Sequence, residues 1–335
     1  MILQQENHIE KINITKLFIY VLIYKVVIEL IYIFRISPIY GYTGLTLDRN
    51  TVGFLLSNVF LCLIICLVPR DKARPSTYLY LIFLLFLVVP LLSYYWLNNQ
   101  SLLYVCVVVL ACLIISVFLK LIKPANIFEK IKSANTILGA IFIIYILITI
   151  YMIIKRGGLD LRAFNLKSIY DIRSEAQFTG LLGYLLNWCA KVFCPFFFAY
   201  YLYKKKKWKM SIVLFLQLFL YLTFAFKAYL FSIGMLVMVS IAVKNNRFER
   251  DFSLGFTAVI IFTYILDILN ISTSLLNSIP YRMIYVPAQI QYQYYEFFNH
   301  RDKMLFADGV IGRIFSIESP FDRPVPYVIS SYYYN

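Results

Sequence analysis

The stretch MSIVLFLQLFLYLTFAFKAYLFSIGMLVMVSIAV, residues 210–243, decides the fold. It is apolar almost throughout and is long enough for two membrane spans, because a helix needs about 20 apolar residues to cross a bilayer. The basic runs KKKKWK (204–209) and KNNRFER (244–250) flank it. Basic residues concentrate in cytoplasmic loops, so both ends are expected in the cytoplasm. The stretch is therefore predicted to be a helical hairpin with Lys227 at its outer tip.

The same apolar character extends along the whole chain of 335 residues. It is 61% hydrophobic and 15% charged, with a mean hydropathy of +0.74. Lipid offers no hydrogen-bond partner to a backbone, so spanning segments of this kind are helices. The sequence predicts an all-α, polytopic transmembrane helix bundle that forms one membrane domain over 1–335. The net charge of +15 is interpreted as membrane topology, and no nucleic-acid partner is expected.

About nine spans are expected along this domain. They are 15–34, 52–68, 77–97, 102–121, 134–154, 180–203, 210–226, 228–243 and 252–269. Short basic segments recur between alternate spans, which places the N-terminus in the cytoplasm. Two longer segments, 155–177 and 270–335, are then extracytoplasmic.

Seven arginines in these two outer segments are candidates for binding an anion. They are Arg156, Arg162, Arg173, Arg282, Arg301, Arg313 and Arg323. A guanidinium group matches phosphate oxygens in a bidentate way and stays charged at physiological pH. The alternative is ordinary loop charge, balanced by nearby aspartate and glutamate.

Charged residues inside the spans are a second group of candidates, because each costs about 2.5–3.5 kcal/mol at a helix centre on insertion scales. Lys25 and Glu29 are one helical turn apart and are predicted to form a structural pair. Lys191 needs a partner across the bundle, and Glu29 and Asp267 are candidates. Lys227 either contributes to function or extends to the membrane interface.

The segment SIPYRMIYVPAQIQYQYYEFFNHRDK, residues 278–303, breaks the apolar pattern near the end of the chain. Proline favours the first helical turn, so an interfacial helix is expected near 287–300, beginning at Pro287. Apolar side chains fall on one face of it and amides and a carboxylate on another: Ile290, Tyr294, Phe297 and Phe298 against Gln289, Gln293 and Glu296. Tyr294 and Gln293 are candidates for contacting a glycan; the alternative is an aromatic belt alone.

These features resemble the Wzy-type oligosaccharide repeat-unit polymerases, the O-antigen and capsule polymerases of bacterial membranes. The resemblance covers about 155–300. It rests on YDIR (170–173) in an outer loop, on the mid-helix proline of CPFFFAYYLYKKKKWK, on the tip lysine of FAFKAYLF and on RMIYVPAQIQYQYYEFF (282–298). Phe226 stands where the family commonly has a glycine. Family members usually continue with further spans, so the chain is expected to be truncated at its C-terminus.

The resemblance implies glycosyl transfer at the outer face of the bacterial cytoplasmic membrane. A glycan linked to polyprenyl (undecaprenyl) pyrophosphate would be passed to the next lipid-linked repeat unit, and the two outer loops would supply the site. Pyrophosphate contacts are then expected from Arg173 and Arg282 above all, and from Tyr170, Lys227, Arg156 and Arg301. Glu296 and His300 are the leading candidates for a general base, followed by Asp308 and Glu175. No cofactor or metal is expected; a chain-length regulator and a flippase are possible partners.

Three other functions remain open from the sequence. A transporter or lipid-linked oligosaccharide flippase would use charges inside the bundle, of which Lys25, Glu29 and Lys191 are the only ones in the predicted spans that favour it. A glycan ligase would use the same lipid-linked donor with a different acceptor. A scaffold protein would need none of these residues.

Overall fold

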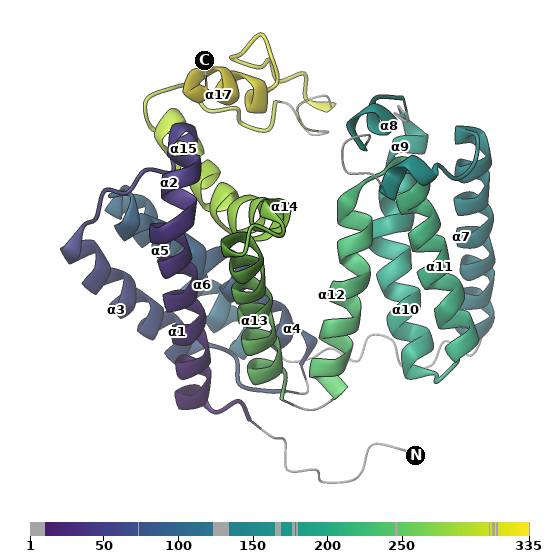
Figure 1. Ribbon diagram of the computed structural model, residues 1–335, viewed down its shortest axis with the longest axis horizontal. Helices are drawn as coiled ribbons and strands as arrows, with labels where there is room; N and C mark the ends of the chain where they lie inside the picture. The colour runs from purple at the N-terminus through teal and green to yellow at the C-terminus, as the bar shows by residue number, and fades with distance from the viewer. Residues whose placement is uncertain are drawn as a thin grey trace. The chain divides into compact units, whose positions relative to one another are not determined.

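The computed structural model describes most of the chain. The described residues are 11–72, 74–122, 134–164, 169–175, 178, 180–244, 247–307, 309, 312 and 314–334, with the backbone alone at 134, 164, 169, 170 and 174. Among them, eight helices are long and apolar enough to cross a membrane, and Thr51–Leu67 is a shorter apolar helix of 17 residues. The chain is an all-α polytopic bundle, as predicted (Figure 1).

The chain divides into two compact units. Unit 1 comprises Met1–Lys123 and Asn246–Asn335, and unit 2 comprises Pro124–Asn245. The helices described in unit 1 are α1 (Ile14–Ile31), η1 (Tyr32–Ile36), α2 (Ser37–Tyr40), η2 (Gly41–Thr43), α3 (Thr51–Leu67), α4 (Pro75–Phe83), η3 (Leu84–Val88), α5 (Val89–Leu97), α6 (Leu102–Leu121), α13 (Phe248–Ile268), α14 (Thr273–Leu276), η6 (Asn277–Tyr285), α15 (Val286–Asn299) and α17 (Val325–Tyr334). Those of unit 2 are α7 (Ala134–Arg156), η4 (Leu161–Phe164), α8 (Ile169–Glu175), α9 (Leu181–Trp188), η5 (Cys189–Phe193), α10 (Cys194–Tyr203), α11 (Lys207–Phe224) and α12 (Lys227–Lys244).

Capping residues in the sequence explain where the first helices begin. The side chain of Asn13 accepts a hydrogen bond from the backbone N–H of Lys16, and that of Asn50 accepts from Gly53, so both satisfy donors that a helix start leaves free. The first span was expected to end at 34. Its helical backbone instead continues to Thr43, because the π-helical turn η1 joins α1 to α2 without a break.

In unit 1, segments that were predicted to lie on the same side of the membrane contact one another. Lys11 forms a bridge with Asp71, and Lys72 pairs with Glu249 at 3.1 Å, so three segments predicted to be cytoplasmic meet at one end. The predicted outer segments meet in the same way, because Asp48 forms a bridge with Asn98. The grouping agrees with the topology derived from charge.

The helical hairpin predicted from residues 210–243 is confirmed in unit 2. Helix α11 ends at Phe224. The next residue, Ala225, adopts the left-handed conformation with φ 52° and donates its N–H to the carbonyl of Tyr221 at 2.7 Å. Such a residue closes a helix by capping its last carbonyls. Helix α12 then begins at Lys227, so this lysine lies at the tip of the hairpin as expected.

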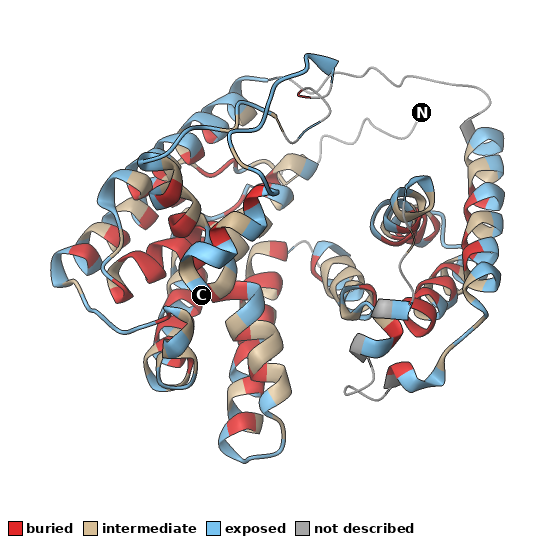
Figure 2. Cartoon of the chain, turned by 90° about the horizontal axis from the view of Figure 1, so that it is seen from above, coloured by how far each residue is buried: buried red, intermediate tan, exposed pale blue. Residues whose placement is uncertain are grey.

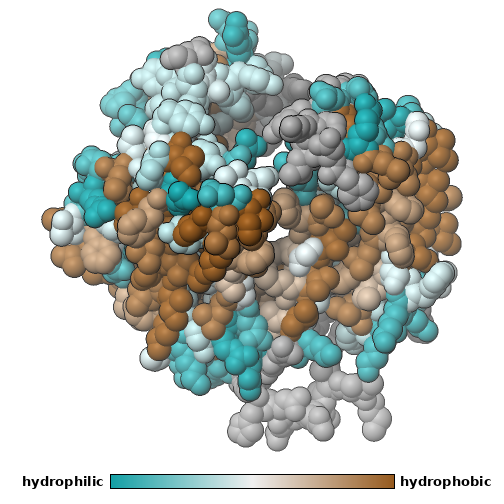
Figure 3. Space-filling view, in the orientation of Figure 1, coloured by the Kyte–Doolittle hydropathy of each residue, from teal (hydrophilic) through white to brown (hydrophobic). Residues whose placement is uncertain are grey.

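Burial separates the helices inside each unit from those that face outward. Most helices carry a stripe of buried residues (Figure 2), but only 22% of the apolar window of α6 and of α7 is buried. Apolar side chains cover the middle of the helices on the face seen in Figure 3, while polar ones gather near the ends. Apolar surface of this extent on a helix long enough to span is the pattern of a lipid-facing segment.

Candidate functional site

Arg173 and the tip of the α11–α12 hairpin form a cationic cluster in unit 2. The Nε atom of Arg173 donates to the carbonyl of Ala225 at 3.0 Å, and its guanidinium lies 5.3 Å from the ring centre of Phe226. The left-handed turn at Ala225 leaves that carbonyl free of the α-helical ladder. Arg173 is therefore held by a hydrogen bond to Ala225 and a cation–π contact with Phe226, the two residues that precede Lys227.

Lys227 is half-buried at the first position of α12. Within the described residues its ammonium makes no ion pair or hydrogen bond. The N-terminus of an 18-residue helix carries partial positive charge. Arg173, Lys227 and this helix start together form a positive surface that suits an anionic group. The side chain of Tyr170, the first residue of YDIR, lies outside the described residues.

The other arginines of the first outer loop are largely neutralised by carboxylates. Arg156 pairs with Glu175 at 3.2 Å, and Arg162 pairs with Asp160 at 2.7 Å and with Glu175 at 3.3 Å. The hydrogen bond from Arg162 lowers the pKa of the Asp160 carboxyl below its usual value. These pairs are exposed or partly exposed. The loop-charge interpretation therefore fits Arg156 and Arg162 better than Arg173, and Glu175 already accepts from two arginines.

A second cationic cluster lies in unit 1 around Arg282. Arg282 is exposed on η6, beside Tyr281, whose ring stacks on Tyr40 with centres 3.9 Å apart. Near them, the Nε atom of Arg35 lies 2.7 Å from a carboxylate oxygen of Asp267. Sequence reasoning missed Arg35. The signal that could have found it is the pair of opposite charges, Arg35 and Asp267, at the same predicted ends of two spans.

Both candidate partners of Lys191 are engaged elsewhere. Glu29 accepts from Lys25 at 2.6 Å and from the indole N–H of Trp96 at 2.7 Å, while Asp267 pairs with Arg35. The predicted Lys25–Glu29 pair is confirmed, and it is buried. Two of the three intramembrane charges that favoured a transporter thus neutralise each other.

Helix α15 begins at Val286, with Pro287 in its first turn, in agreement with the helix expected near 287–300. The sequence left open which face of this helix packs against the rest of the protein. The amides of Gln289 and Gln293 face the protein and are buried, and Gln289 donates to the carbonyl of Thr43 at 2.6 Å. Packing decides this face, because buried amides with partners are satisfied whereas the tyrosines tolerate partial exposure.

The C-terminal helix α17 covers α15 through three consecutive tyrosines. Arg301 lies 4.7 Å from the ring centre of Phe297 and 5.1 Å from that of Tyr332. Tyr333 donates to Glu296 at 3.0 Å, and Gln293 donates to the hydroxyl of Tyr334, also at 3.0 Å. Three predicted site residues, Gln293, Glu296 and Arg301, are therefore brought together beneath one short helix.

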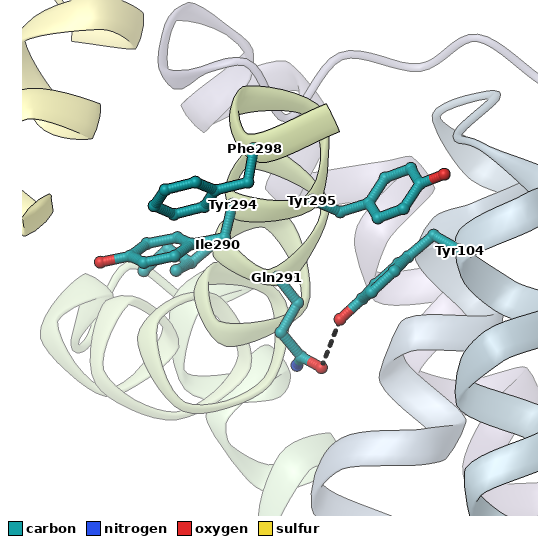
Figure 4. Close-up of a pocket in the computed structure, with 6 residues that line it drawn as sticks. All are labelled: Tyr104, Ile290, Gln291, Tyr294, Tyr295 and Phe298. Carbon is teal, nitrogen blue, oxygen red and sulfur yellow. Dashed lines mark hydrogen bonds between the residues drawn. The ribbon is translucent and has the colours of Figure 1, made fainter. Parts of the chain in front are cut away.

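The outward face of α15 borders a shallow apolar hollow of about 500 Å³ (Figure 4). Tyr104, at the start of α6, donates a long hydrogen bond of 3.4 Å to Gln291, and Tyr295 lies beside it with ring centres 4.9 Å apart. Tyr294 and Phe298 line the hollow as well. Tyr294, a predicted glycan contact, thus lies at an accessible aromatic surface.

No family model, curated protein or solved structure matches this chain. Its function must therefore be argued from the two clusters themselves.

The remaining predicted site residues are exposed or lie outside the described residues. His300 follows the last turn of α15 and is exposed, and Arg323 is exposed on the segment before α17. Asp308 and Arg313 lie outside the described residues. The 155–177 loop belongs to unit 2 and 270–335 to unit 1. That both loops serve one site stays a prediction.

Proposed function

We propose that this protein joins oligosaccharide repeat units carried on polyprenyl pyrophosphate, at the outer face of a bacterial cytoplasmic membrane. The single observation that carries the proposal is the fixed position of Arg173 on Ala225 and Phe226, the two residues that precede Lys227 at the hairpin tip. A guanidinium group held by its own hydrogen bond and ring contact needs no reorganisation when charge develops on a leaving group.

The chemistry assigns a role to this cluster. The bond between the anomeric carbon of the donor glycan and the pyrophosphate oxygen breaks, and a hydroxyl oxygen of the acceptor glycan bonds to that carbon. The hydroxyl proton passes to a base or to water, and polyprenyl pyrophosphate leaves with the extra negative charge. Arg173, Lys227 and the start of α12 would stabilise that charge.

Acceptor binding is proposed for the aromatic surface of α15. Ring faces of tyrosine pack against the apolar faces of sugars, and Tyr294 lies at the open hollow. Both candidate bases are exposed, but Glu296 already accepts a hydrogen bond from Tyr333, so His300 is the better candidate. The Lys25–Glu29 pair argues against a transporter, since its charges are satisfied within one helix.

The decisive experiment uses a strain that lacks the gene and is complemented with variants. Surface glycan is expected to collapse to single repeat units in the deletion strain and in Lys227→Met, and to be restored by the wild type. Lys244→Met, at the opposite end of the same helix, is the matched control. Normal chain lengths in the deletion strain would overturn the proposal. Polymer that accumulates without being attached to its acceptor would indicate the ligase instead.

A further inference from the structure

A small cavity in unit 2 lies where η5 and the start of α10 face the first turns of α12. Its volume is about 210 Å³, and its lining includes Lys191, Pro195, Ala228, Ser232 and Met235. Most of that lining is apolar, and Lys191 is the charged residue in it. Neither Arg173 nor Lys227 is among the residues that line it.

Lys191 lies well inside a membrane-spanning segment, Leu181–Tyr203. It is exposed, and among the described residues of unit 2 no ion pair or hydrogen bond of its ammonium is found. Charges at such positions are rare because they are costly, and those that occur are generally paired or functional. Lys191 therefore calls for an anion that the described part of its own unit does not supply.

One buried side chain holds both walls of this cavity. The amide nitrogen of Gln217 donates to the carbonyl of Ala190 at 3.2 Å and to the hydroxyl of Ser232 at 2.9 Å. Gln217 is fully buried, and its amide oxygen has no hydrogen-bond partner in the part of the chain that the structure describes. The π-helical turn η5, which contains Ala190 and Lys191, is of a kind frequent at functional sites. Because this buried amide links the two walls through hydrogen bonds, the shape of the cavity is fixed and does not result from loose packing.

We propose that this cavity binds the phosphate of a membrane lipid, with Lys191 as its counter-ion. A lysine ammonium binds phosphate as a point charge. The aliphatic lining beside it, including Pro195, Ala228 and Met235, suits the hydrocarbon that adjoins a lipid headgroup. The proposal does not depend on the proposed function, because it uses neither Arg173 nor α15.

The test measures lipid retention by the purified protein in native mass spectrometry. Wild-type protein is expected to retain phosphatidylglycerol more strongly than phosphatidylcholine, whose own choline competes for the phosphate charge. Lys191→Met is expected to weaken phosphatidylglycerol retention by about tenfold, the effect of losing one charge-assisted contact. Lys191→Arg should keep most of it. Lys244→Met is the matched control, because it removes a lysine from the far end of α12.

Two results would overturn the proposal. Undiminished phosphatidylglycerol retention in Lys191→Met, with the variant eluting as a folded protein, would remove the counter-ion role. The second uses inorganic phosphate as the probe in a thermal-shift measurement. A stabilisation by free phosphate that Lys191→Met abolishes, without any preference for phosphatidylglycerol, would assign the cavity to a soluble anion. A glycan-length assay on Lys191→Met separates either failure from failure of the proposed polymerase.

Discussion

The guanidinium of Arg173 donates a hydrogen bond to the carbonyl of Ala225 across 52 residues of sequence. The bond ties the short helix α8 to the tip of a membrane hairpin, and it fixes the arginine on the two residues that precede Lys227. Two motifs that are far apart in the sequence, YDIR and FAFKAYLF, are thereby in contact in the fold. The contact depends on the left-handed turn at Ala225, which exposes the carbonyl.

Arg173→Lys tests whether the geometry of the arginine matters beyond its charge. A lysine cannot both donate to Ala225 and present a planar group to Phe226, so polymer formation is expected to fall by about 10²-fold or more, as when a fixed donor to a developing charge is lost. Glycan length at equal protein level is the measurement. Arg162→Lys is the control, because its ion pairs are exposed, and it should stay close to wild type. Equal effects of the two substitutions would contradict the assignment.

Gly44→Ala tests how α15 packs against the loop that contains Gly44, within unit 1. Gly44 has φ +89°, and a Cβ there would lie 2.8 Å from the amide nitrogen of Gln289. Strain in the left-handed region and the displaced amide are expected to cost about 1–3 kcal/mol of stability. Gly41→Ala is the matched control, since nothing lies within 4 Å of its Cβ and its φ is helical. Melting curves followed by size-exclusion chromatography should show a clear loss for Gly44→Ala alone.

Single and double substitutions of Lys25 and Glu29 test whether this pair is structural. Removing one partner leaves an uncompensated buried charge, so Lys25→Met or Glu29→Gln is expected to lower stability by about 3–5 kcal/mol. The double variant should recover part of that loss, because no buried charge remains. Glycan length per folded molecule should be unchanged in it. Abolished activity in a well-folded double variant would instead favour a transporter.

A double-mutant cycle between Tyr333 and Glu296 tests the cover that α17 forms over α15. Tyr333→Phe and Glu296→Gln are each expected to lower stability by about 1 kcal/mol, with coupling because they share one hydrogen bond. Tyr327→Phe, at an exposed position of the same helix, is the control. Additive effects of Tyr333→Phe and Glu296→Gln would show that the contact contributes nothing.

The same hydrogen bond has a defined pH dependence. Burial, and then the hydrogen bond to Glu296, raise the pKa of the Tyr333 phenol above its ordinary value of 10.0. A raised pKa in the folded state means that the stabilisation is complete below about pH 10 and is lost as the pH rises through the folded value. The coupling energy should therefore be constant from about pH 6 to about pH 9. A decline within that range would contradict the shift.

Local physics made the helices predictable from sequence. Long apolar runs leave lipid as the only suitable surroundings, asparagine caps mark starts such as those of α1 and α3, and the i, i+4 spacing of Lys25 and Glu29 already places both on one face. The basic runs on both sides of residues 210–243 predicted that this stretch folds back as a hairpin.

Tertiary packing decided which polar groups remain available. The sequence could not assign Asp267 to Arg35 rather than to Lys191, nor Glu175 to two arginines, because such pairs join distant segments. It also could not orient α15, whose periodicity admits either face. Burying the amides of Gln289 and Gln293 against fixed partners selects one face, since a buried amide without a partner costs more than a half-exposed tyrosine.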